Sequence, residues 1–513
     1  MKEPAVGSVE YWAIKTPHRI AVLEGDRALT WSEWDIQSNR LASALKKRGI
    51  EAGDIVVART QIRTEWVILH QALAKLGCRL LGLNWRLTPA ETEYVLANSA
   101  ASGIVCDDQD PAAVAPAWAN LPIKVAISID TQAEGFEDWS TVLSEQSDDR
   151  FTTSTPPPLI VYTSGTTGLP KGVEMNQPRR GSEQEMKEYF RSMAERRSQR
   201  EGDVVLVTMP LHHGAGPALV KETASKGNIQ ILQRRFDAEE ALSLIDKYKI
   251  TYWNGVPTMY KRMSGLPQDI LDKYDVSSVR SLSVGAAPVT PELKAWITSY
   301  FGDCLSEGYG STETSMITSI SSEKLKEKPG SSGLPYRHVQ IEIRDENNNL
   351  LPVGDVGEIW VRTPVTISTY LNASEGNSCD ENGFFQTGDV GRLDEDNYLY
   401  ITDRVKDMII SGGVNIYPAE IENALLRHPA LQDAAVIGIP HDEFGEQVMA
   451  FCEVKPEQTI SIDELSAHCA GQLASYKRPR SFEIVKELPR NAMGKVLKRT
   501  LREPYWKGRE RQV

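Results

Sequence analysis

The chain has 513 residues, of which 41% are hydrophobic and 25% charged, and its formal net charge at pH 7 is -13. This length exceeds what one hydrophobic core supports and predicts several domain-sized units. The acidic balance argues against a general nucleic-acid-binding protein, whose phosphate contacts need surplus lysine and arginine.

The cysteines and the N-terminus both favour a cytoplasmic location. No two cysteines form a C-x-x-C pair, which gives no indication of a zinc site or a disulfide framework, and a reducing compartment fits best. The cysteines are Cys78, Cys106, Cys304, Cys379, Cys452 and Cys469. The first residues lack an apolar signal core, and no stretch approaches the ~20 apolar residues of a membrane helix.

Helix and strand signals alternate over residues 29–105. Residues 39–49 have helical spacing and end at a glycine, 66–77 form a second helix, and 54–58 and 79–83 read as short strands. Thr88 begins a capping box, with proline at the first helical position. This alternation predicts a layered α/β architecture.

The middle of the chain is more polar. Residues 107–158 resemble a connector, and 159–162 form a strand that leads into a glycine-rich loop. Residues 178–202 are dense in Arg, Glu, Lys and Ser, which predicts a solvated helix, because a nucleic-acid arm would show a run of basic residues alone.

The pattern of residues along the sequence changes after Asp394. Residues 403–407 look like a charged hinge, followed by a glycine loop and an alternation of helix, strand, strand and helix. About 110 residues suffice for a separate domain, so we expect a small α+β unit at the C-terminal end. The expected elements are helices at 418–427 and 462–473 and strands at 434–440 and 448–454.

The loop from Thr163 to Lys171 has the composition of a phosphate-binding loop. Its glycines allow a tight backbone, its hydroxyl side chains and amides donate hydrogen bonds, and its lysine supplies charge. These residues are Thr163, Ser164, Gly165, Thr166, Thr167, Gly168 and Lys171. It is not a Walker A loop, because Pro170 stands where that motif needs glycine. On composition alone, a flexible surface loop is the alternative.

Three other sequence patterns give weaker indications of a binding site. Gly308–Glu313 and Gly214–Gly216 each lack the third glycine of a dinucleotide fingerprint, so a Rossmann NAD site is unsupported. The pair His212–His213 has no third ligand nearby in sequence, so a metal site there is not indicated. A lone histidine is more often structural.

Six sequence blocks occur in the order found in the adenylate-forming superfamily. They are residues 162–172, 309–313, 387–389, 403–407, 411–413 with 415–418, and 493–495. From about Tyr11 to Lys498 the chain resembles this superfamily, which includes acyl-CoA synthetases, luciferases and peptide-synthetase adenylation domains. The spacing is most similar to that of acyl-CoA synthetases.

The resemblance implies a fold and a two-step reaction. We expect an α/β adenylate-forming fold with a large N-terminal domain at 1–403, a hinge at 404–408 and a mobile α+β domain at 409–513. A carboxylate would attack the ATP α-phosphorus to give acyl-adenylate and pyrophosphate, and the thiol of CoA would then displace AMP. Positioned cations and donors would carry most of this catalysis.

The resemblance also implies roles for single residues. Ser164, Thr166, Thr167 and Lys171 would hold the triphosphate, Thr312 would contact the α-phosphate, and Glu313 would bind Mg²⁺, a cation that prefers oxygen. Lys495 would bridge the carboxylate and the α-phosphate. The adenine, ribose and acyl contacts would come from Gly285, Ala286, Ala287, Pro288, Tyr309, Gly310, Asp389, Arg404 and His213. Taken singly, each carboxylate or lysine would be read as an ordinary surface group.

Lys406 stands where the superfamily has its hinge residue. Rotation of the small domain there would move Lys495 out of the site and bring in Ser411, Gly412 and Gly413, beside a tunnel for pantetheine. One site would then serve both reactions.

The chain departs from the superfamily pattern at two positions. Gln177 ends a block that usually closes with a Thr-His pair, and His212 stands where phenylalanine is common. Glutamine cannot carry a proton charge, which leaves open an enzyme that performs only the thioester step on a preformed adenylate.

The acid and the thiol acceptor are weakly encoded. Small residues at 214–216 and 285–287 suggest a roomy pocket, and the Gln177 block resembles synthetases for bulky polycyclic acids of the steroid or terpenoid kind. Aromatic and medium-chain acids stay open, and the glycines also fit close backbone packing alone. Loading of a carrier-protein thiol, a catalytically silent binding protein, luciferase-like oxidation and a homodimer are further readings.

Overall fold

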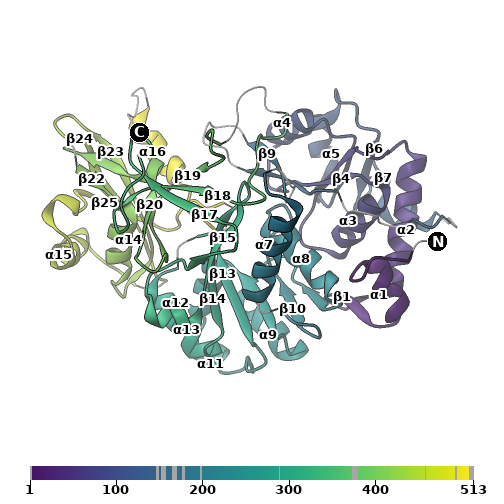
Figure 1. Cartoon of the computed structure of the whole chain (residues 1–513), viewed down its shortest axis with the longest axis horizontal. Helices are drawn as coiled ribbons and strands as arrows, with labels where there is room; N and C mark the ends of the chain where they lie inside the picture. The colour runs from purple at the N-terminus through teal and green to yellow at the C-terminus, as the bar shows by residue number, and fades with distance from the viewer. Residues whose placement is uncertain are drawn as a thin grey trace.

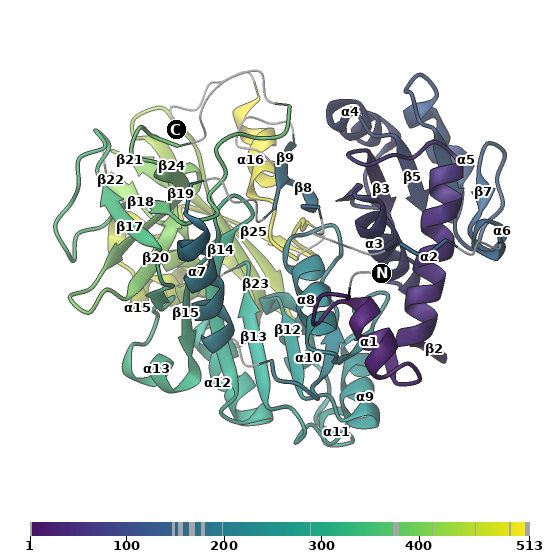
Figure 2. The ribbon, with the colours of Figure 1, turned by 45° about the vertical axis from the view of Figure 1, so that its right-hand side comes forward.

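The computed structural model shows a large α/β region joined to a smaller unit at the C-terminal end, at opposite ends of the long axis (Figures 1 and 2). It describes residues 3–145, 149–151, 157–163, 170–175, 180–196, 199–287, 289–372, 379–412, 414–456, 458–491 and 494–507.

The first sheet carries the strand that precedes the glycine-rich loop. In the described residues it has seven strands in the order β7-β6-β5-β3-β4-β8-β9, all parallel to their neighbours except for β9. The strands are β3 (Ile55–Arg59), β4 (Arg79–Gly82), β5 (Gly103–Cys106), β6 (Val125–Ser128), β7 (Glu137–Asp138), β8 (Ile160–Thr163) and β9 (Lys171–Glu174).

The second sheet also belongs to the large region and is the largest sheet of the described residues. Its nine strands run in the order β16-β15-β14-β13-β12-β10-β11-β1-β2, with a parallel centre and antiparallel edges. They are β1 (Ile20–Glu24), β2 (Arg27–Thr30), β10 (Val204–Val207), β11 (Ile229–Leu232), β12 (Tyr252–Gly255), β13 (Ser281–Gly285), β14 (Leu305–Ser311), β15 (Ser315–Ser321) and β16 (Leu334–Pro335).

Two antiparallel-rich sheets complete the molecule. A four-stranded sheet holds β17 (Gln340–Arg344), β18 (Gly357–Arg362), β19 (Phe385–Leu393) and β20 (Leu399–Arg404) in that order. The small domain has the order β22-β21-β24-β23, and β25 pairs with β24. Its strands are β21 (Ile409–Ser411), β22 (Val414–Ile416), β23 (Leu431–His441), β24 (Gly445–Val454) and β25 (Ser481–Val485).

Amphipathic helices cover these sheets. In the large region they are α1 (Val9–Lys15), α2 (Trp31–Lys47), α3 (Thr64–Leu76), α4 (Pro89–Ser99), α5 (Pro111–Val114), α6 (Trp139–Ser144), α7 (Glu183–Arg196), α8 (Ala215–Ser225), α9 (Ala238–Tyr248), α10 (Pro257–Ser264), α11 (Gln268–Leu271), α12 (Pro291–Phe301) and α13 (Ser322–Glu327). The small domain has α14 (Pro418–Leu426), α15 (Ile462–Gln472) and α16 (Lys498–Trp506). Short 3₁₀ turns lie at Ala115–Trp118, Val405–Asp407 and Ser475–Lys477.

Several hydrophobic cores hold the sheets and helices in their relative positions. One core joins α1, α2 and α3 to strands of both large sheets, through residues such as Trp31, Trp66 and Val205. A second core packs α9, α10 and α12 on the nine-stranded sheet. The small domain buries both faces of β23 and β24, since Val436 and Ile437 lie in different cores. The nine-stranded sheet is likewise buried on both faces, since Val205 and Leu206 of β10 lie in different cores.

Most predicted elements are confirmed. The strands at β3, β4 and β8 and the helices α3, α14 and α15 lie where the sequence predicts them, within one to three residues. Thr88 caps α4 in a capping box, with its side chain accepting from the Glu91 amide. The predicted strands of the small domain are confirmed as β23 and β24. The α/β class and the large-plus-small organisation follow, while the boundaries at 404–408 stay a prediction.

Two predictions needed correction. The helix expected at 39–49 begins at Trp31, where Thr30 and Glu33 form a second capping box, and it ends at Lys47. Residues 107–158 are not a connector as a whole, because α5, β6, β7 and α6 lie within them and extend the seven-stranded sheet. The elements in this range are short and separated by polar residues, so the sequence shows no clear helix or strand periodicity there.

The helix predicted in 178–202 is α7, and it is only partly solvated. Its charged residues face outward, but Tyr189 is fully buried and donates from its hydroxyl to the Met316 carbonyl at 2.7 Å. Tyr189 also shares a hydrophobic core with Ile343 of β17 and Ile359 of β18, so the helix links the four-stranded sheet to β15.

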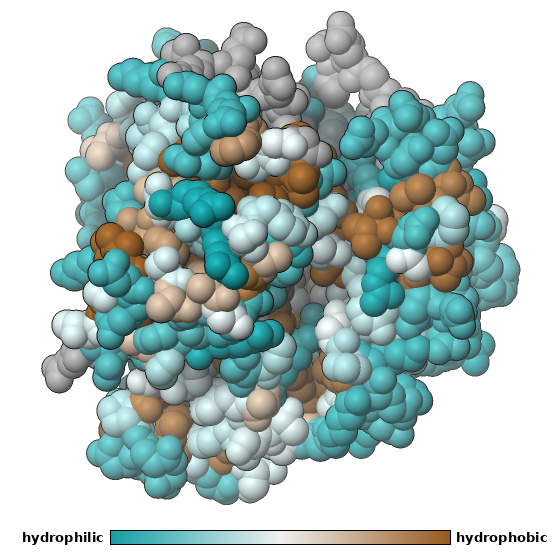
Figure 3. All heavy atoms as spheres, turned by 90° about the vertical axis from the view of Figure 1, so that its left-hand side faces the viewer, coloured by the Kyte–Doolittle hydropathy of each residue, from teal (hydrophilic) through white to brown (hydrophobic). Residues whose placement is uncertain are grey.

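The molecular surface is mostly hydrophilic on the face shown in Figure 3, and the hydrophobic residues there form separated patches. Large exposed hydrophobic side chains among the described residues include Ile14, Leu350 and Ile484. In the part of the chain that the structure describes, no helix combines the length and the apolar character needed to cross a membrane.

Candidate active site

The carboxyl ends of β12, β13 and β14 define one end of the nine-stranded sheet. Side chains and backbone that bind ligands in parallel sheets gather at such ends. Gly285 pairs with Gly308 across β13 and β14, and a Cβ placed on Gly285 would lie 2.8 Å from the Gly308 carbonyl oxygen. The next residue, Ala286, has a φ of 66°. The chain thus turns sharply with little side chain, which leaves backbone groups open at this edge.

The two ends of the glycine-rich loop lie side by side next to this edge. Thr163 and Lys171 are paired across the hairpin of β8 and β9. The Thr163 hydroxyl donates to the Glu313 carboxylate at 3.1 Å, and Glu313 lies in the turn between β14 and β15. The loop residues Ser164, Gly165, Thr166, Thr167 and Gly168 lie outside the described residues. The loop's anchors are therefore joined directly to the turn that carries Thr312 and Glu313.

Tyr370 lies next to the loop anchor Lys171, and the sequence analysis did not identify it as a site residue. The Lys171 ammonium lies 4.9 Å from the centre of the Tyr370 ring, within cation–π range. The backbone holds the contact in place, since the Leu371 amide donates to the Gly172 carbonyl at 2.8 Å. Burial, and then the Glu313 carboxylate, raise the pKa of Tyr370. No motif or spacing distinguishes Tyr370 from the other tyrosines of the chain.

A second group of polar residues lies where the four-stranded sheet meets β14. The Tyr309 hydroxyl donates to Asp389 at 2.7 Å, and the Arg404 Nε lies 3.1 Å from the other carboxylate oxygen of Asp389. Asp389 and Arg404 also face each other as register partners on β19 and β20. Burial, and then Asp389, raise the pKa of Tyr309 well above its ordinary value. These contacts orient one carboxylate with considerable precision.

Lys495 comes to this group from the small domain. Burial, and then the nearby Arg404 guanidinium, lower its pKa to about 8, and Asp389 and Asp407 act in the opposite direction. The loop reaches this far because Gly494 lies against α10, where a Cβ would be 2.2 Å from the Thr258 hydroxyl oxygen. Gly494 also has a φ of 73°, which favours glycine. Residues as far apart along the chain as Tyr309 and Lys495 therefore share one site.

The histidine pair lies at the loop between β10 and α8. The ring centres of His212 and His213 are 4.8 Å apart. Burial lowers the pKa of His213 to about 4. The pKa of His212 also lies well below its ordinary value, first through burial and then through His213 and Arg86. Both imidazoles are therefore neutral at physiological pH, and His213 is half-buried beside the small residues that begin α8.

The structure does not bring every predicted residue to this place. Ser411 pairs with Gly445, and the Gly412 amide donates to the Phe444 carbonyl at 2.9 Å, so the contacts given for this hairpin lie within the small domain. Lys406 does lie near the second group: it belongs to the 3₁₀ turn Val405–Asp407, where Arg502 of α16 donates to its carbonyl at 2.8 Å, and its charge helps to lower the pKa of Lys495. Pro288, Gln177 and Gly413 lie outside the described residues.

The residues that do meet fall into two linked groups. The loop anchors and the β14–β15 turn bring together Thr163, Lys171, Thr312, Glu313 and Tyr370, and the second group holds Tyr309, Asp389, Arg404 and Lys495. Gly285, Ala286, Ala287 and Gly310 supply the backbone edge between them. Hydroxyls, two carboxylates and three cations at the end of a parallel sheet suit a phosphorylated nucleotide and a second anionic group.

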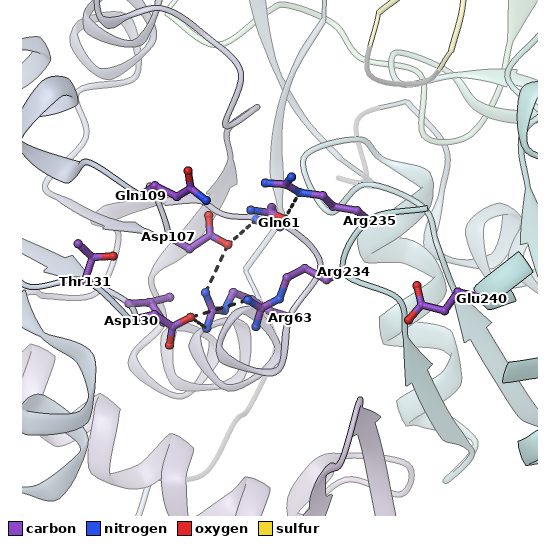
Figure 4. A pocket seen from close by; sticks show the side chains of 10 residues that line it. Gln61, Arg63, Asp107, Gln109, Asp130, Thr131, Arg234, Arg235 and Glu240 are labelled. Atoms are coloured by element: carbon purple, nitrogen blue, oxygen red, sulfur yellow. Dashed lines mark hydrogen bonds and ion pairs between the residues drawn. The ribbon is translucent and has the colours of Figure 1, made fainter. Parts of the chain in front are cut away.

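A separate polar cavity of about 550 Å³ lies at the ends of β3, β5 and β6 (Figure 4). Two of its three arginines pair with carboxylates: Arg63 with Glu65, Asp107 and Asp130, and Arg234 with Glu24. The third, Arg235, donates to the Gln61 side chain. Because the lining carboxylates Asp107, Asp130 and Glu240 balance the three arginines, the cavity offers little surplus charge to a phosphate and we assign it no ligand.

Known proteins match nearly the whole chain. The family model of the AMP-binding enzyme matches residues 9–371, and that of the AMP-binding enzyme C-terminal domain matches residues 420–495. The chain is 31% identical to the fatty acid–[acyl-carrier-protein] ligase ScoC of Streptomyces coeruleorubidus, over 99% of this chain and 98% of that protein. It is 33% identical to the 2-succinylbenzoate–CoA ligase of Bacillus licheniformis, over 95% and 97%. The ATP-bound crystal structure of MatB from Rhodopseudomonas palustris superposes with a TM-score of 0.84 at 28% identity, covering 98% and 99%.

Proposed function

Because the chain belongs to the AMP-binding enzyme family, as an enzyme of the acyl-CoA synthetase type, we propose that it joins a carboxylic acid to CoA in two steps. In the first step the acid attacks ATP and forms acyl-adenylate with release of pyrophosphate. In the second step the CoA thiol attacks the adenylate and releases AMP. The observation that carries this proposal is that Lys495 of the small domain lies within electrostatic range of Asp389 and Arg404, which Tyr309 and an ion pair hold in place.

The first step follows from the placement of the charges. Tyr309 packs on adenine, and Asp389, already oriented by Tyr309 and Arg404, accepts the two ribose hydroxyls. Lys495 bridges the acid and the α-phosphate, where its charge offsets the repulsion between two anions. Lys171 and the loop hydroxyls hold the β- and γ-phosphates, and Thr312 contacts the α-phosphate.

Glu313 supplies the protein's ligand to Mg²⁺. The cation prefers oxygen donors and keeps waters or substrate phosphates in most of its positions, so one or two carboxylates suffice. Within the described residues no three His, Cys, Asp or Glu side chains cluster as a ready-made metal site. Glu313 with the Thr163 hydroxyl at 3.1 Å provides hard oxygen atoms beside the loop. Bound there, the ion would neutralise the triphosphate as pyrophosphate leaves.

The second step needs a different arrangement of the small domain. Lys406 and its neighbours act as the hinge, and rotation removes Lys495 and brings Ser411, Gly412 and Gly413 beside a pantetheine tunnel. His213 lines the acyl pocket as a neutral group, because its pKa of about 4 leaves it uncharged. The proximity of Lys495 to Asp389 supports assigning the arrangement in this structure to the first step.

The acid that fits best is bulky, of a polycyclic, steroid or terpenoid kind. Flexible methionines line the glycine positions: a Cβ on Gly214 would lie 2.8 Å from the Met175 methyl, and one on Gly308 would lie 2.6 Å from the Met316 methyl. Methionine side chains move at low cost and adapt to irregular ligands. An aromatic or medium-chain acid is the alternative, and the name of the Bacillus licheniformis relative specifies 2-succinylbenzoate.

A carrier-protein thiol is the second candidate acceptor, because the name of the ScoC relative specifies an acyl carrier protein. An enzyme restricted to the thioester step is the third, on account of Gln177. The presence of Lys495 in the site favours a working first step over that reading. Cytoplasmic location and a homodimer stay predictions from the sequence.

A panel of carboxylic acids tests the proposal. With ATP and Mg²⁺, we expect at least one bulky or aromatic acid to give pyrophosphate release, and added CoA to give an acyl-CoA product detected by mass. Parallel reactions with a holo carrier protein decide the acceptor. Pyrophosphate release without any acyl-CoA, but with an acylated carrier, would overturn CoA as the acceptor. Thioester from supplied adenylate without pyrophosphate release would show the one-step enzyme.

The first step should weaken in alkaline solution. Lysine bridges two anions only while it is protonated, and the charge is lost as the pH rises through the lowered pKa of Lys495, about 8. We expect kcat/KM for ATP in pyrophosphate release to fall about tenfold per pH unit above that value. Lys495→Arg should move this limb upward, since guanidinium stays charged. An unchanged limb in that variant would contradict the assignment.

A further inference from the structure

One short helix of the large region contacts the small domain at two points. Thr258 and Lys261, three residues apart and so on one face of α10, make the contact. Gly494 packs against Thr258, and the Lys261 ammonium lies 3.2 Å from an Asp433 oxygen on β23. The first contact belongs to the loop of Lys495, and the second to the body of the small domain. The helix therefore contacts both the loop that carries Lys495 and the body of the small domain.

A continuous set of polar contacts joins the two docking points. The other oxygen of Asp433 accepts from Arg490 at 2.8 Å, and the same guanidinium nitrogen lies 2.9 Å from Glu453. Arg490 also donates to the Gly494 carbonyl at 3.3 Å. One residue on, the Asn491 amide donates to the Lys495 carbonyl at 2.9 Å. Asp433 is thus held between a lysine of the large region and the arginine that supports the Lys495 loop.

The charges balance only when the domains are docked. Lys261 and Arg490 oppose Asp433 and Glu453, so the docked set is neutral, whereas the small domain alone would carry two carboxylates against one guanidinium. The side chains are 27%, 15%, 16% and 14% exposed respectively, so solvent screens them only in part. Burial lowers the pKa of Lys261, and Asp433 acts against that effect. Among the ion pairs of the described residues, Lys261 pairs only with Asp433.

We infer that Lys261 is a positioning residue that holds the small domain in the orientation for the first step. The inference rests on the proposed two-step function. Any rotation that takes Lys495 out of the site also carries Asp433 away from Lys261. The pair therefore stabilises one orientation and not the other, which is the condition for shifting the population between them. Through Asp433 and Arg490 it also fixes the loop that presents Lys495.

Lys261→Met tests the inference, because it keeps the aliphatic stem and removes the charge. We expect pyrophosphate release to fall about 3- to 10-fold, while thioester formation from supplied acyl-adenylate holds or rises. Lys261→Arg, which still reaches a carboxylate, should restore the ratio of the two rates. Lys273→Met, on an exposed lysine that pairs with Glu239 within the large region, is the matched control. Equal loss in both steps, or no change in either, would overturn the inference.

A double-mutant cycle and a structural measurement complete the test. Because Lys261→Met and Asp433→Asn remove the same contact, their combined effect on the ratio should be smaller than the product of the single effects. Energy transfer between dyes at Gln268→Cys and Asp463→Cys should report a second domain orientation in Lys261→Met and not in Lys261→Arg. An identical distribution in all three proteins would refute the inference even if no acid were turned over. Failure of the unmodified enzyme on every acid would refute the proposed function instead.

Discussion

Lys495→Ala is expected to reduce pyrophosphate release by about 100-fold or more, because a preorganised charge at the reacting phosphate is usually worth that much. Thioester formation from supplied acyl-adenylate should stay within about threefold of the unmodified enzyme. The lysine lies beside Asp389 and Arg404 in this structure, where it would meet the acid and the α-phosphate. In the proposed mechanism Lys495 leaves the site before the thiol arrives, so we expect the second step not to depend on its charge.

The comparison needs both half-reactions measured on the same preparation. Lys486→Ala removes an exposed lysine of the same domain and serves as the control. Melting temperatures of the three proteins establish that the variants fold. Equal loss of the two activities in Lys495→Ala would sink the account in which one site serves two steps by domain rotation. Loss of the second step alone would reverse the assignment of the orientation seen here.

The sequence predicted this site through its motifs rather than through its geometry. Thr163 and Lys171 lie in one loop after a buried strand, so their proximity follows from local chain structure. Tyr309, Asp389 and Lys495 are far apart along the chain, and only the order of the blocks grouped them. Each alone would have been read as an ordinary surface residue. The structure adds the contacts that orient them, such as the Tyr309–Asp389 hydrogen bond.

Contacts without a motif could not be predicted. Tyr370 covers Lys171 because the backbone of Leu371 is tied to Gly172, and neither residue carries a recognisable pattern. Lys261 and Asp433 are ordinary charged residues of a helix and a strand, which propensity places on the surface. Their pairing depends on how two domains dock, and single-sequence periodicity contains no information on docking.

The fold was predicted best where a helix or strand stands alone between clear stops. The helix α3 ends at Gly77, whose φ is 73°, and the sequence stop was sufficient. The start of α2 was placed eight residues late, although Thr30 and Glu33 carry the capping-box pattern. The elements of residues 107–145 were missed because β6 and β7 are too short to show a period.

Asp389→Asn should differ from Lys495→Ala in a way that separates nucleotide binding from chemistry. The carboxylate is oriented by Tyr309 and Arg404, and it would accept both ribose hydroxyls of ATP and of the acyl-adenylate. Hydrogen bonds to a charged group are worth about 1.5–3 kcal/mol each, so weakening both ribose contacts should lower kcat/KM for ATP by about 100- to 10,000-fold. The amide also leaves Asp407 as the remaining carboxylate that opposes the charges of Arg404 and Lys495.

The second half-reaction decides the meaning of that loss. Because the adenylate keeps its ribose, Asp389→Asn should also raise the KM for supplied acyl-adenylate, whereas Lys495→Ala should not. Asp396→Asn, a change of the same kind at a carboxylate that is 68% exposed and pairs with Lys328, is the control. A variant at Asp389 with normal use of supplied adenylate would contradict ribose binding and leave Asp389 only a part in holding Arg404. The two variants together therefore distinguish Asp389, which is expected to bind the nucleotide in both steps, from Lys495, which is expected to act in the first step alone.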